Sequence, residues 1–226
     1  MSATVIVIAK APVPGRVKTR LTPPLRPEQA AVLARAALED TLAAVGHSRL
    51  AGRRVVALDG EPDGWLPEGF ELVAQRGDGL AQRLAAAFED VGGPALLVGM
   101  DTPQVTPDLL DAGLAGLANG ADAVLGTATD GGYWAIGLAR ADPRVFAGVP
   151  MSRPSTGAAQ RARLAALELE THYLPPLRDV DTFEDARSVA AAAPGSRFTA
   201  ALRDLARYSA PEPANSTPVM SSQRAR

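Results

Sequence analysis

The sequence contains no cysteine, which excludes a disulfide framework, a thiolate zinc site and a cysteine nucleophile. Histidine is nearly as rare, since only His47 and His172 occur, both in contexts that predict surface positions. Aromatic residues make up 4% of the chain, so the core must be built from alanine, valine and leucine. The formal net charge is −2, and without a basic excess we expect no nucleic-acid partner.

Long hydrophobic runs are also lacking. The first apolar run, Val5–Ile8, is too short for a signal peptide or a membrane span, and no basic segment precedes it. We therefore expect a cytoplasmic protein with no membrane span. The sequence has no G-x-S-x-G motif, which disfavours a serine hydrolase, and no G-x-G-x-x-G after the first strand, which disfavours a Rossmann dehydrogenase.

What the chain does contain is a regular alternation of short apolar runs with helical patterns, which predicts an α/β fold with a mostly parallel central sheet flanked by helices. At 226 residues the chain is long enough for one well-buried core. We expect a single domain over residues 1–208 and a disordered tail over 209–226, where proline, serine, asparagine and glutamine dominate. The expected strands are Val5–Ala9, Val55–Leu58, Phe70–Ala74, Ala95–Val98, Ala121–Gly126, Tyr133–Leu138 and one near Leu169–Tyr173. The expected helices are Pro27–Val45, Leu80–Val91, one after Thr106, one near Ala158–Ala166 and one opening at Thr182.

Basic residues concentrate in the loop that follows the first strand. Between Lys10 and Arg26 there are five basic residues and no acidic one. Such a loop could neutralise a diphosphate or triphosphate, although a solvated basic loop is the alternative. The candidate phosphate-binding residues are Lys10, Gly15, Arg16, Lys18 and Arg20.

A glycine-rich turn closes the third expected strand and opens a helix. Gly77 and Gly79 could admit a base or a phosphate against the backbone N–H groups of the helix start. A plain turn explains the same residues equally well.

Asp101 follows the fourth expected strand directly. A carboxylate at the end of a buried strand is costly unless it is paired or binds a cation. Mg²⁺ (or Mn²⁺) prefers one or two carboxylates, with phosphate oxygens of the substrate completing its shell. Asp101 is therefore the first candidate metal ligand, and an Asx-type turn is the alternative.

Two further acidic positions lie at strand or helix ends. Asp181 with Glu184 fits a capping box, although the aspartate could still turn one oxygen toward a metal. Asp130, Gly131 and Gly132 form an ordinary turn sequence between strands, and could offer a carboxylate and bare backbone to a sugar or an acceptor.

Taken in order, five motifs resemble the glycosyltransferase-A superfamily, with its nucleotide-diphospho-sugar transferase type of fold. They are Lys10–Leu21, Gln75–Leu80, Gly99–Pro103, Asp130–Tyr133 and Asp179–Asp185. Within that superfamily the chain is similar to the bacterial selenodomain-associated, glycosyltransferase-like family of unknown function. It also resembles, more distantly, 2-phospholactate guanylyltransferases and molybdenum-cofactor-type nucleotidyltransferases.

The resemblance implies roles for individual residues. Lys18 and Arg20 would contact phosphates, and Gln75 and Gly77 would lie near the base. Asp101 and the late acidic motif would share Mg²⁺. Residues 10–20 and Asp101 should then converge on one rim of the sheet, across the magnesium ion.

The remaining roles concern the acceptor and catalysis. Asp101, Asp130 and Lys18 are the candidate catalytic residues, and Asp101 and Asp181 the candidate metal ligands. The glycines of the D-G-G-Y motif join the donor-binding set, and residues 151–157 are expected to form an acceptor-side loop.

Three functions stay open at this point. The first is glycosyl transfer from a nucleotide sugar to a small-molecule acceptor, which the family resemblance implies. The second is nucleotidyl transfer with release of pyrophosphate, which the single aspartate of Gly99-Met100-Asp101 suits better. The third is a non-catalytic nucleotide-sensing module. The sequence indicates no oligomeric state.

Overall fold

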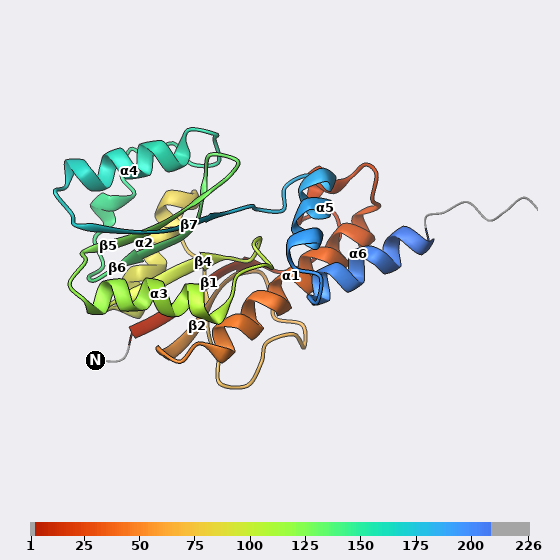
Figure 1. Ribbon diagram of the computed structural model, residues 1–226, viewed down its shortest axis with the longest axis horizontal. Coiled ribbons are helices and arrows are strands. Elements are labelled where there is room, and N and C mark those ends of the chain that lie inside the picture. Colours follow the sequence, from red (N-terminus) through yellow and green to blue (C-terminus); the bar gives the residue numbers. More distant parts are fainter. Residues whose placement is uncertain (1–2, 209–226) are drawn as a thin grey trace, which may run out of the picture.

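The computed structural model describes residues 3–208. Within that range the chain forms a seven-stranded sheet in the order β3-β2-β1-β4-β6-β5-β7 (Figure 1). All neighbouring strands are parallel except β6, which runs antiparallel to β4 and to β5. The strands are Ala3–Lys10 (β1), Ala51–Asp59 (β2), Glu71–Ala74 (β3), Ala95–Gly99 (β4), Ala123–Ala128 (β5), Tyr133–Leu138 (β6) and Thr171–Leu177 (β7).

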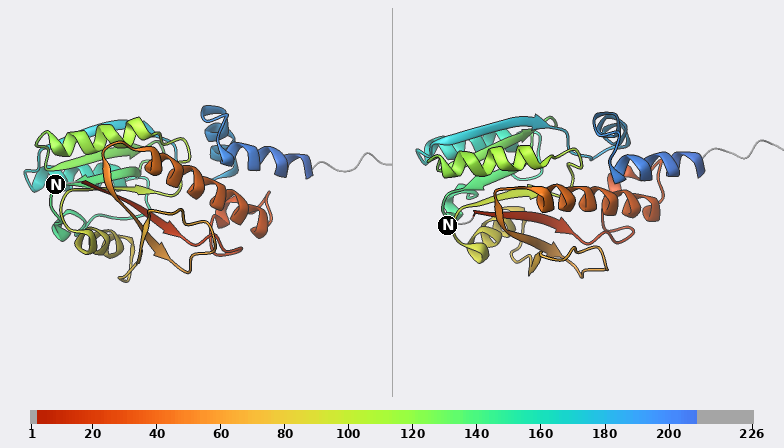
Figure 2. Two further views of the ribbon diagram at one scale, coloured as in Figure 1. Left: turned by 90° about the horizontal axis from the view of Figure 1, so that it is seen from below. Right: turned by 60° about the horizontal axis from the view of Figure 1, so that its bottom comes forward.

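Helices cover both faces of this sheet (Figure 2). The α-helices within residues 3–208 are Pro27–His47 (α1), Leu80–Val91 (α2), Pro107–Ala118 (α3), Thr156–Ala166 (α4), Phe183–Ala192 (α5) and Arg197–Tyr208 (α6). Two short 3-10 turns, Thr19–Leu21 (η1) and Pro143–Val145 (η2), complete the described elements. None of the helices between residues 3 and 208 has the length and apolar character needed to cross a bilayer.

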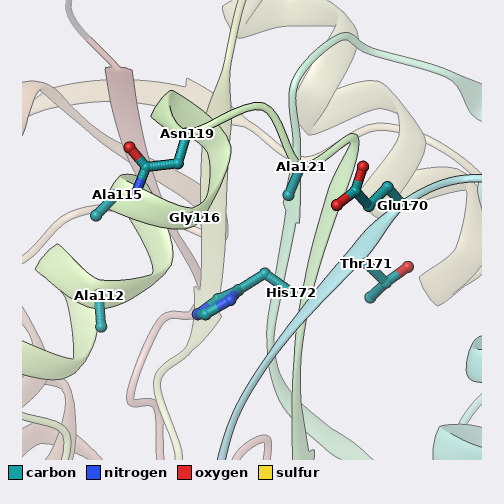
Figure 3. A pocket seen from close by; sticks show the side chains of 8 residues that line it. All are labelled: Ala112, Ala115, Gly116, Asn119, Ala121, Glu170, Thr171 and His172. Atoms are coloured by element: carbon teal, nitrogen blue, oxygen red, sulfur yellow. The ribbon is translucent and has the colours of Figure 1, made fainter.

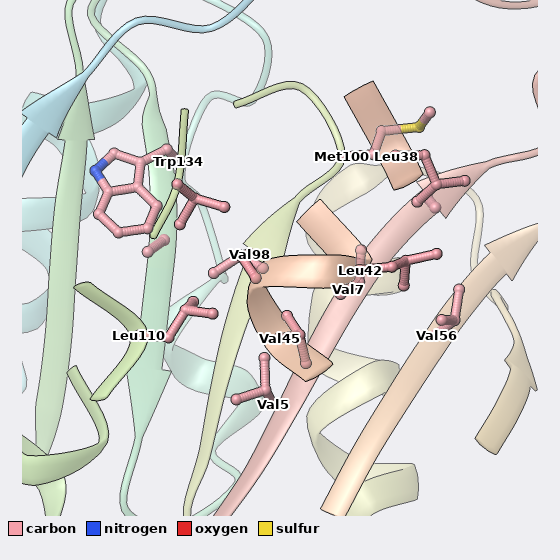
Figure 4. Packing of buried hydrophobic residues seen from close by; sticks show 14 of the residues in the cluster. Val5, Val7, Leu38, Leu42, Val45, Val56, Val98, Met100, Leu110 and Trp134 are labelled. Carbon is pink, nitrogen blue, oxygen red and sulfur yellow. The ribbon is translucent and has the colours of Figure 1, made fainter. Parts of the chain in front are cut away.

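The pleat of β1 explains why both of its faces are apolar. Successive side chains of a strand point to opposite faces, so Val5 and Val7 join one core cluster while Ile6 joins another. The first cluster is covered by α1 and α3, as the packing of Leu38 and Leu110 over β1 and β4 shows (Figure 4). The second is covered by α2 and α4. A doubly covered parallel sheet therefore accounts for the unbroken hydrophobic run of the first strand.

A third apolar cluster lies beyond the sheet, where the first half of α1 meets α5 and α6 (Figure 1). Leu21 of η1, Leu33 of α1 and Phe198 of α6 are buried in it. Asp40 of α1 also accepts hydrogen bonds from the first backbone N–H groups of α6, at 3.0 and 2.9 Å. This helical lobe stands at the carboxyl ends of the parallel strands, and it positions the candidate site.

The structure confirms the expected fold class, a mostly parallel sheet flanked by helices. The tail predicted over 209–226 lies outside the described residues. Two details differ from the sequence prediction. Strand β7 reaches Leu177, beyond the predicted end at Tyr173, through two prolines that an edge strand tolerates. Helix α6 was not predicted, because its polar sequence becomes helical through the packing of Phe198 and Leu202 on α1 and α5.

Candidate active site at the carboxyl edge of the sheet

The sheet topology gathers the predicted motifs at one edge. The loops after β1, β2, β4 and β7 leave from the carboxyl ends of strands that run in the same direction. Because β6 is antiparallel to β4, with Val98 opposite Ala135, its first residue Tyr133 lies at that edge as well. The D-G-G loop between β5 and β6 therefore faces the same rim, where open α/β sheets bind their ligands.

The centre of this rim is the ammonium group of Lys18, which lies between two carboxylates. Its Nζ is 2.8 Å from Oδ1 of Asp101 and 3.8 Å from Oδ1 of Asp181. Only 7% of the Lys18 side chain is exposed, compared with 39% for Asp101 and 38% for Asp181. Arg20 donates to the second oxygen of Asp181 at 3.0 Å from a mostly exposed position. The structure thus brings together four residues that the sequence assigned to phosphate and metal binding.

A buried valine explains why segments so distant in the chain meet here. Val180 packs in the helical lobe in the same cluster as Leu21, which follows Lys18 by three residues. The backbone N–H of Val180 donates to the carbonyl of Asp101 at 2.9 Å, and its carbonyl accepts a hydrogen bond from Lys18. The lobe therefore fixes both the basic loop and the acidic segment against the end of β4.

The start of α5 corrects one sequence interpretation. The capping box is formed by Thr182 and Asp185, whose reciprocal side-chain to backbone hydrogen bonds measure 3.2 and 2.9 Å. The pair Asp181 and Glu184 does not cap the helix. Because the cap is one residue further along, the Asp181 carboxylate points to Lys18 and Arg20 instead.

Asp179 is an acidic residue of the site that the sequence analysis did not single out. Its Oδ1 is wholly shielded and has no hydrogen-bond partner among residues 3–208. Burial raises the pKa of the Asp179 carboxyl to about 7, and the nearby charges of Asp101 and Asp130 contribute to the rise. Its position two residues before Asp181, just after an edge strand, is the signal that could have identified it. The site therefore carries more carboxyl groups than two candidate metal ligands require.

The D-G-G loop is joined tightly to the 151–157 segment. Gly131 has a φ of +95°, and a Cβ at this position would lie 1.9 Å from the carbonyl oxygen of Pro154. The carbonyl of Gly131 accepts from the N–H of Gly157 at 2.7 Å. Asp130 accepts from the N–H of Gly132 at 2.9 Å, which closes the turn. The expected acceptor-side loop is thus in direct backbone contact with the turn that carries the candidate catalytic aspartate.

Lys10 lies further along the rim, on the β2 side. Its Nζ is 3.7 Å from Asp59 Oδ2, and Arg83 of α2 reaches the same oxygen at 3.0 Å. The structure does not bring Lys10 to the Asp101 carboxylate, although the Lys10 N–H contacts the sulfur of Met100 at 3.2 Å. Asp59 and Arg83 were missed by the sequence analysis, and the position of Asp59 at the end of β2 is the signal that could have found it.

The glutamine–glycine turn is built around backbone contacts. The Gln75 side-chain amide donates to the carbonyls of Ala9 and Ala57, at 2.7 and 2.9 Å, and so ties the ends of β1 and β2 together. Gly77 has a φ of +120°, and a Cβ there would lie 2.6 Å from the Cβ of Gln82. Gly79 is extended and precedes the first turn of α2. The turn therefore exposes the backbone of two glycines at the rim next to Lys10.

The tip of the basic loop is open to solvent. Gly15 has a φ of +75° with no heavy atom within 4 Å of the position of a Cβ. Arg16 is exposed and has no ion-pair partner among residues 3–208. Its guanidinium is thus available to an anion that enters the rim from outside.

A cavity of about 360 Å³ lies elsewhere, between α3 and the start of β7 (Figure 3). Its position at the amino end of β7 places it at the opposite edge of the sheet from Asp179. It is lined by Ala112, Ala115, Gly116, Asn119, Ala121, Glu170, Thr171 and His172. None of the predicted site residues of the described chain contributes to it. Both histidines, His47 and His172, are exposed as predicted.

The donor set suits a hard divalent cation. Asp101 and Asp181 supply carboxylate oxygens from two separate segments, and both pair with the ammonium group of Lys18. Within residues 3–208, no group of three or more histidine or acidic side chains is placed so that it could hold a metal ion without further ligands. Such a two-carboxylate site matches Mg²⁺, which usually takes its remaining ligands from water and substrate phosphates.

Comparison with solved structures defines the class of fold. The structure is similar to that of a candidate nucleotide-diphospho-sugar transferase from Desulfovibrio desulfuricans G20, with a TM-score of 0.81 and 28% identity over 91% of this chain and 96% of that one. The fold is therefore of the nucleotide-diphospho-sugar transferase type. A family model, described as an uncharacterized protein conserved in bacteria (DUF2064), matches residues 30–153. The chain belongs to this family.

Two further similarities concern the fold alone. The 2-C-methyl-D-erythritol 4-phosphate cytidylyltransferase of Thermus thermophilus matches with a TM-score of 0.54 and 18% identity, over 86% of this chain and 100% of that one. A manganese complex of Rv0371C from Mycobacterium tuberculosis H37Rv matches with a TM-score of 0.51 and 20% identity, over 84% and 98%. A search of the curated proteins gave no match. The finer likeness to the selenodomain-associated family stays a prediction.

Proposed function

We propose that the chain is a metal-dependent transferase that uses a nucleotide donor, and that its reaction is glycosyl transfer from a nucleotide sugar. The observation that carries the proposal is the meeting of Lys18, Asp101 and Asp181 at the carboxyl edge of the sheet. The similarity to the Desulfovibrio protein over nearly its whole length supports the choice of donor. A small-molecule acceptor and a cytoplasmic location are part of the same proposal.

In this proposal different residues of the rim bind different parts of the donor. Asp101 and Asp181 would hold Mg²⁺ or Mn²⁺, which supplies charge neutralisation to the diphosphate when it is bound. Arg16 and Arg20 are exposed, and they bind phosphate oxygens from the solvent side. Lys18 contributes a further positive charge to the donor phosphates.

The base and the acceptor are assigned to opposite ends of the rim. The turn from Gln75 to Gly79 offers its backbone to the base beside β2. Asp130 lies on the far side, where its turn contacts the 151–157 segment, and it orients the acceptor hydroxyl. A donor stretched along the rim would place its sugar between these two ends.

Nucleotidyl transfer is the second candidate, and a specific observation favours it. The segment that follows β4 offers a single carboxylate, that of Asp101, since Met100 is a buried apolar residue and Gly99 has no side chain. A single carboxylate with a lysine beside it suits an attack on the α-phosphorus, in which an acceptor phosphate displaces pyrophosphate. The cytidylyltransferase likeness shows that this fold also carries that chemistry in another protein.

Phosphorus NMR of complete reaction mixtures separates the candidates. The protein is incubated with Mg²⁺, candidate acceptors, and either nucleotide sugars or nucleoside triphosphates. Release of a nucleoside diphosphate from a nucleotide sugar supports glycosyl transfer, whereas pyrophosphate release from a triphosphate supports the second candidate. Binding of nucleotides without turnover of any donor would instead indicate the non-catalytic sensing module.

Asp101→Asn is the matched test of the metal assignment. The variant keeps the volume of the side chain but removes its charge, and we expect turnover to fall by about 100-fold or more. Asp108→Asn is the control, because Asp108 is 89% exposed on α3 and pairs with Arg49. Full activity of Asp101→Asn would contradict the assignment of Asp101.

A further inference from the structure

The ammonium group of Lys18 is held where a divalent cation would be expected. Its neighbours are oxygen atoms: a carboxylate oxygen of Asp101 at 2.8 Å, one of Asp181 at 3.8 Å and the carbonyl of Val180. Carboxylate and carbonyl oxygens are also the ligands that hard divalent cations prefer. Lys18 therefore uses the same acidic groups that the proposed function assigns to the metal.

We propose that Lys18 is a displaceable internal cation, which holds Asp101 and Asp181 together until a divalent cation enters and expels its side chain. This inference rests on the proposed function in taking those two aspartates as the metal ligands. It adds that metal binding and the release of Lys18 are one coupled event.

Charge explains why the two cations exclude one another. A divalent ion bound to Asp101 would lie within a few ångströms of Nζ, where repulsion between like charges is strong and the partly buried site screens it poorly. In the absence of metal, the ammonium offsets the repulsion that Asp179 experiences from the charges of Asp101, Asp130 and Asp181.

The side chain of Lys18 is suited to such an exchange. Lysine carries a compact charge on a flexible four-carbon stem, unlike the planar guanidinium of arginine. The loop before it, from Val13 to Arg16, is exposed, so an expelled side chain has solvent and an incoming phosphate within reach. The exchange would present a metal and a free ammonium to the donor at the same time.

Selective labelling of lysine tests the exchange in the unaltered protein. The chain has only two lysines, and the side chain of Lys10 is 45% exposed while that of Lys18 is 7% exposed. Reductive methylation followed by peptide mass spectrometry gives a rate for each. We expect Mg²⁺ to speed the labelling of Lys18 by about tenfold or more, since the exposed fraction sets the rate, and to leave Lys10 unchanged. An unchanged Lys18 rate at saturating Mg²⁺ would overturn the proposal.

Manganese binding provides the second measurement. Free Mn²⁺ is counted by electron paramagnetic resonance in titrations of the wild type, Lys18→Met and Arg35→Met, the last altering a cation that pairs with Glu39 on α1 outside the site. We expect Lys18→Met to bind Mn²⁺ about tenfold more tightly, because a charge-assisted contact no longer competes, while Arg35→Met matches the wild type. Equal or weaker binding by Lys18→Met overturns the proposal, and so does the absence of Mn²⁺ binding by both the wild type and Lys18→Met.

Neither measurement uses a donor, so the two proposals can fail separately. Donor turnover without competition between Lys18 and Mn²⁺ leaves the proposed function standing and removes this inference. Competition in a protein that turns over no donor removes the proposed function alone. If Lys18→Met does not fold, the labelling of the wild-type chain still decides.

Discussion

Replacing Gly131 by alanine should destabilise the protein and disturb the acceptor side of the rim. The added Cβ would lie 1.9 Å from the carbonyl oxygen of Pro154, so the backbone of one of the two loops must move. The φ of +95° adds a conformational cost, which is about 1–2 kcal/mol for a residue with a Cβ in the left-handed region. Overpacking in a tight site costs about 1–3 kcal/mol more. The expected loss for Gly131→Ala is therefore about 2–5 kcal/mol in the free energy of unfolding.

Gly148 offers the matched control for this substitution. It has a φ of +77°, but no heavy atom lies within 4 Å of the position of its Cβ, so Gly148→Ala measures the conformational cost alone. Urea unfolding followed by far-ultraviolet circular dichroism gives both losses, provided that the denaturant dependence is unchanged. Gly131→Ala should lose clearly more stability than Gly148→Ala. If the two variants lose the same free energy of unfolding, the close contact with Pro154 contributes nothing to stability, and the contact between the two loops is not rigid.

Substitutions of two further aspartates test the electrostatics of the molecule. In chelator-treated protein, the free energy of unfolding of the wild type should fall relative to Asp179→Asn from about pH 4 to pH 7, because the folded-state pKa is raised from 3.8 to about 7 and the native protein binds the extra proton in that window. Parallel stability curves of the two proteins over this range would refute the raised pKa. In α3, Asp111→Ala should cost about 2–4 kcal/mol in urea unfolding, because the buried carboxylate accepts hydrogen bonds from the Ser48 hydroxyl and from backbone N–H groups of the turn between α1 and β2, and these donors would lose their partner. Arg49→Ala, which removes an exposed guanidinium that pairs with Asp111 and with Asp108, should cost less than about 1 kcal/mol, and an equal loss for both variants would contradict this account.

The order of strands and helices could be predicted from the sequence because the residues of each segment favour the helix or strand that the segment forms. Helix α3 begins where Thr106 and Pro107 indicate, and the Thr106 hydroxyl accepts from the N–H of Leu109 at 3.3 Å. The meeting of the basic loop with Asp101 also follows from a general rule, since loops after parallel strands share one edge. The antiparallel placement of β6 between β4 and β5 has no local signal, because it depends on pairing between distant strands.

The site was less predictable where a shift of one residue in the position of the helix cap decides which carboxylate is free to bind. In the segment that precedes α5, Asp181 and Thr182 are both good capping residues. Thr182 caps the helix in the structure, and Asp181 is left free for Lys18 and Arg20. Local sequence does not distinguish the two arrangements, since each satisfies the first turn of the helix.

What selects between them is tertiary packing around Val180. This side chain is 1% exposed in the helical lobe, and its burial turns Asp179 and Asp181 away from that core, because neighbouring side chains of an extended segment point in opposite directions. The backbone of Val180 then bonds to Asp101 and to Lys18, although Lys18 lies 162 residues earlier in the chain. One apolar residue between two acids thus determines which carboxylates reach the rim. The geometry of the two candidate metal ligands depends on that packing. A cavity-forming Val180→Ala substitution should therefore weaken Mn²⁺ binding, even though the apolar valine side chain cannot bind the metal itself.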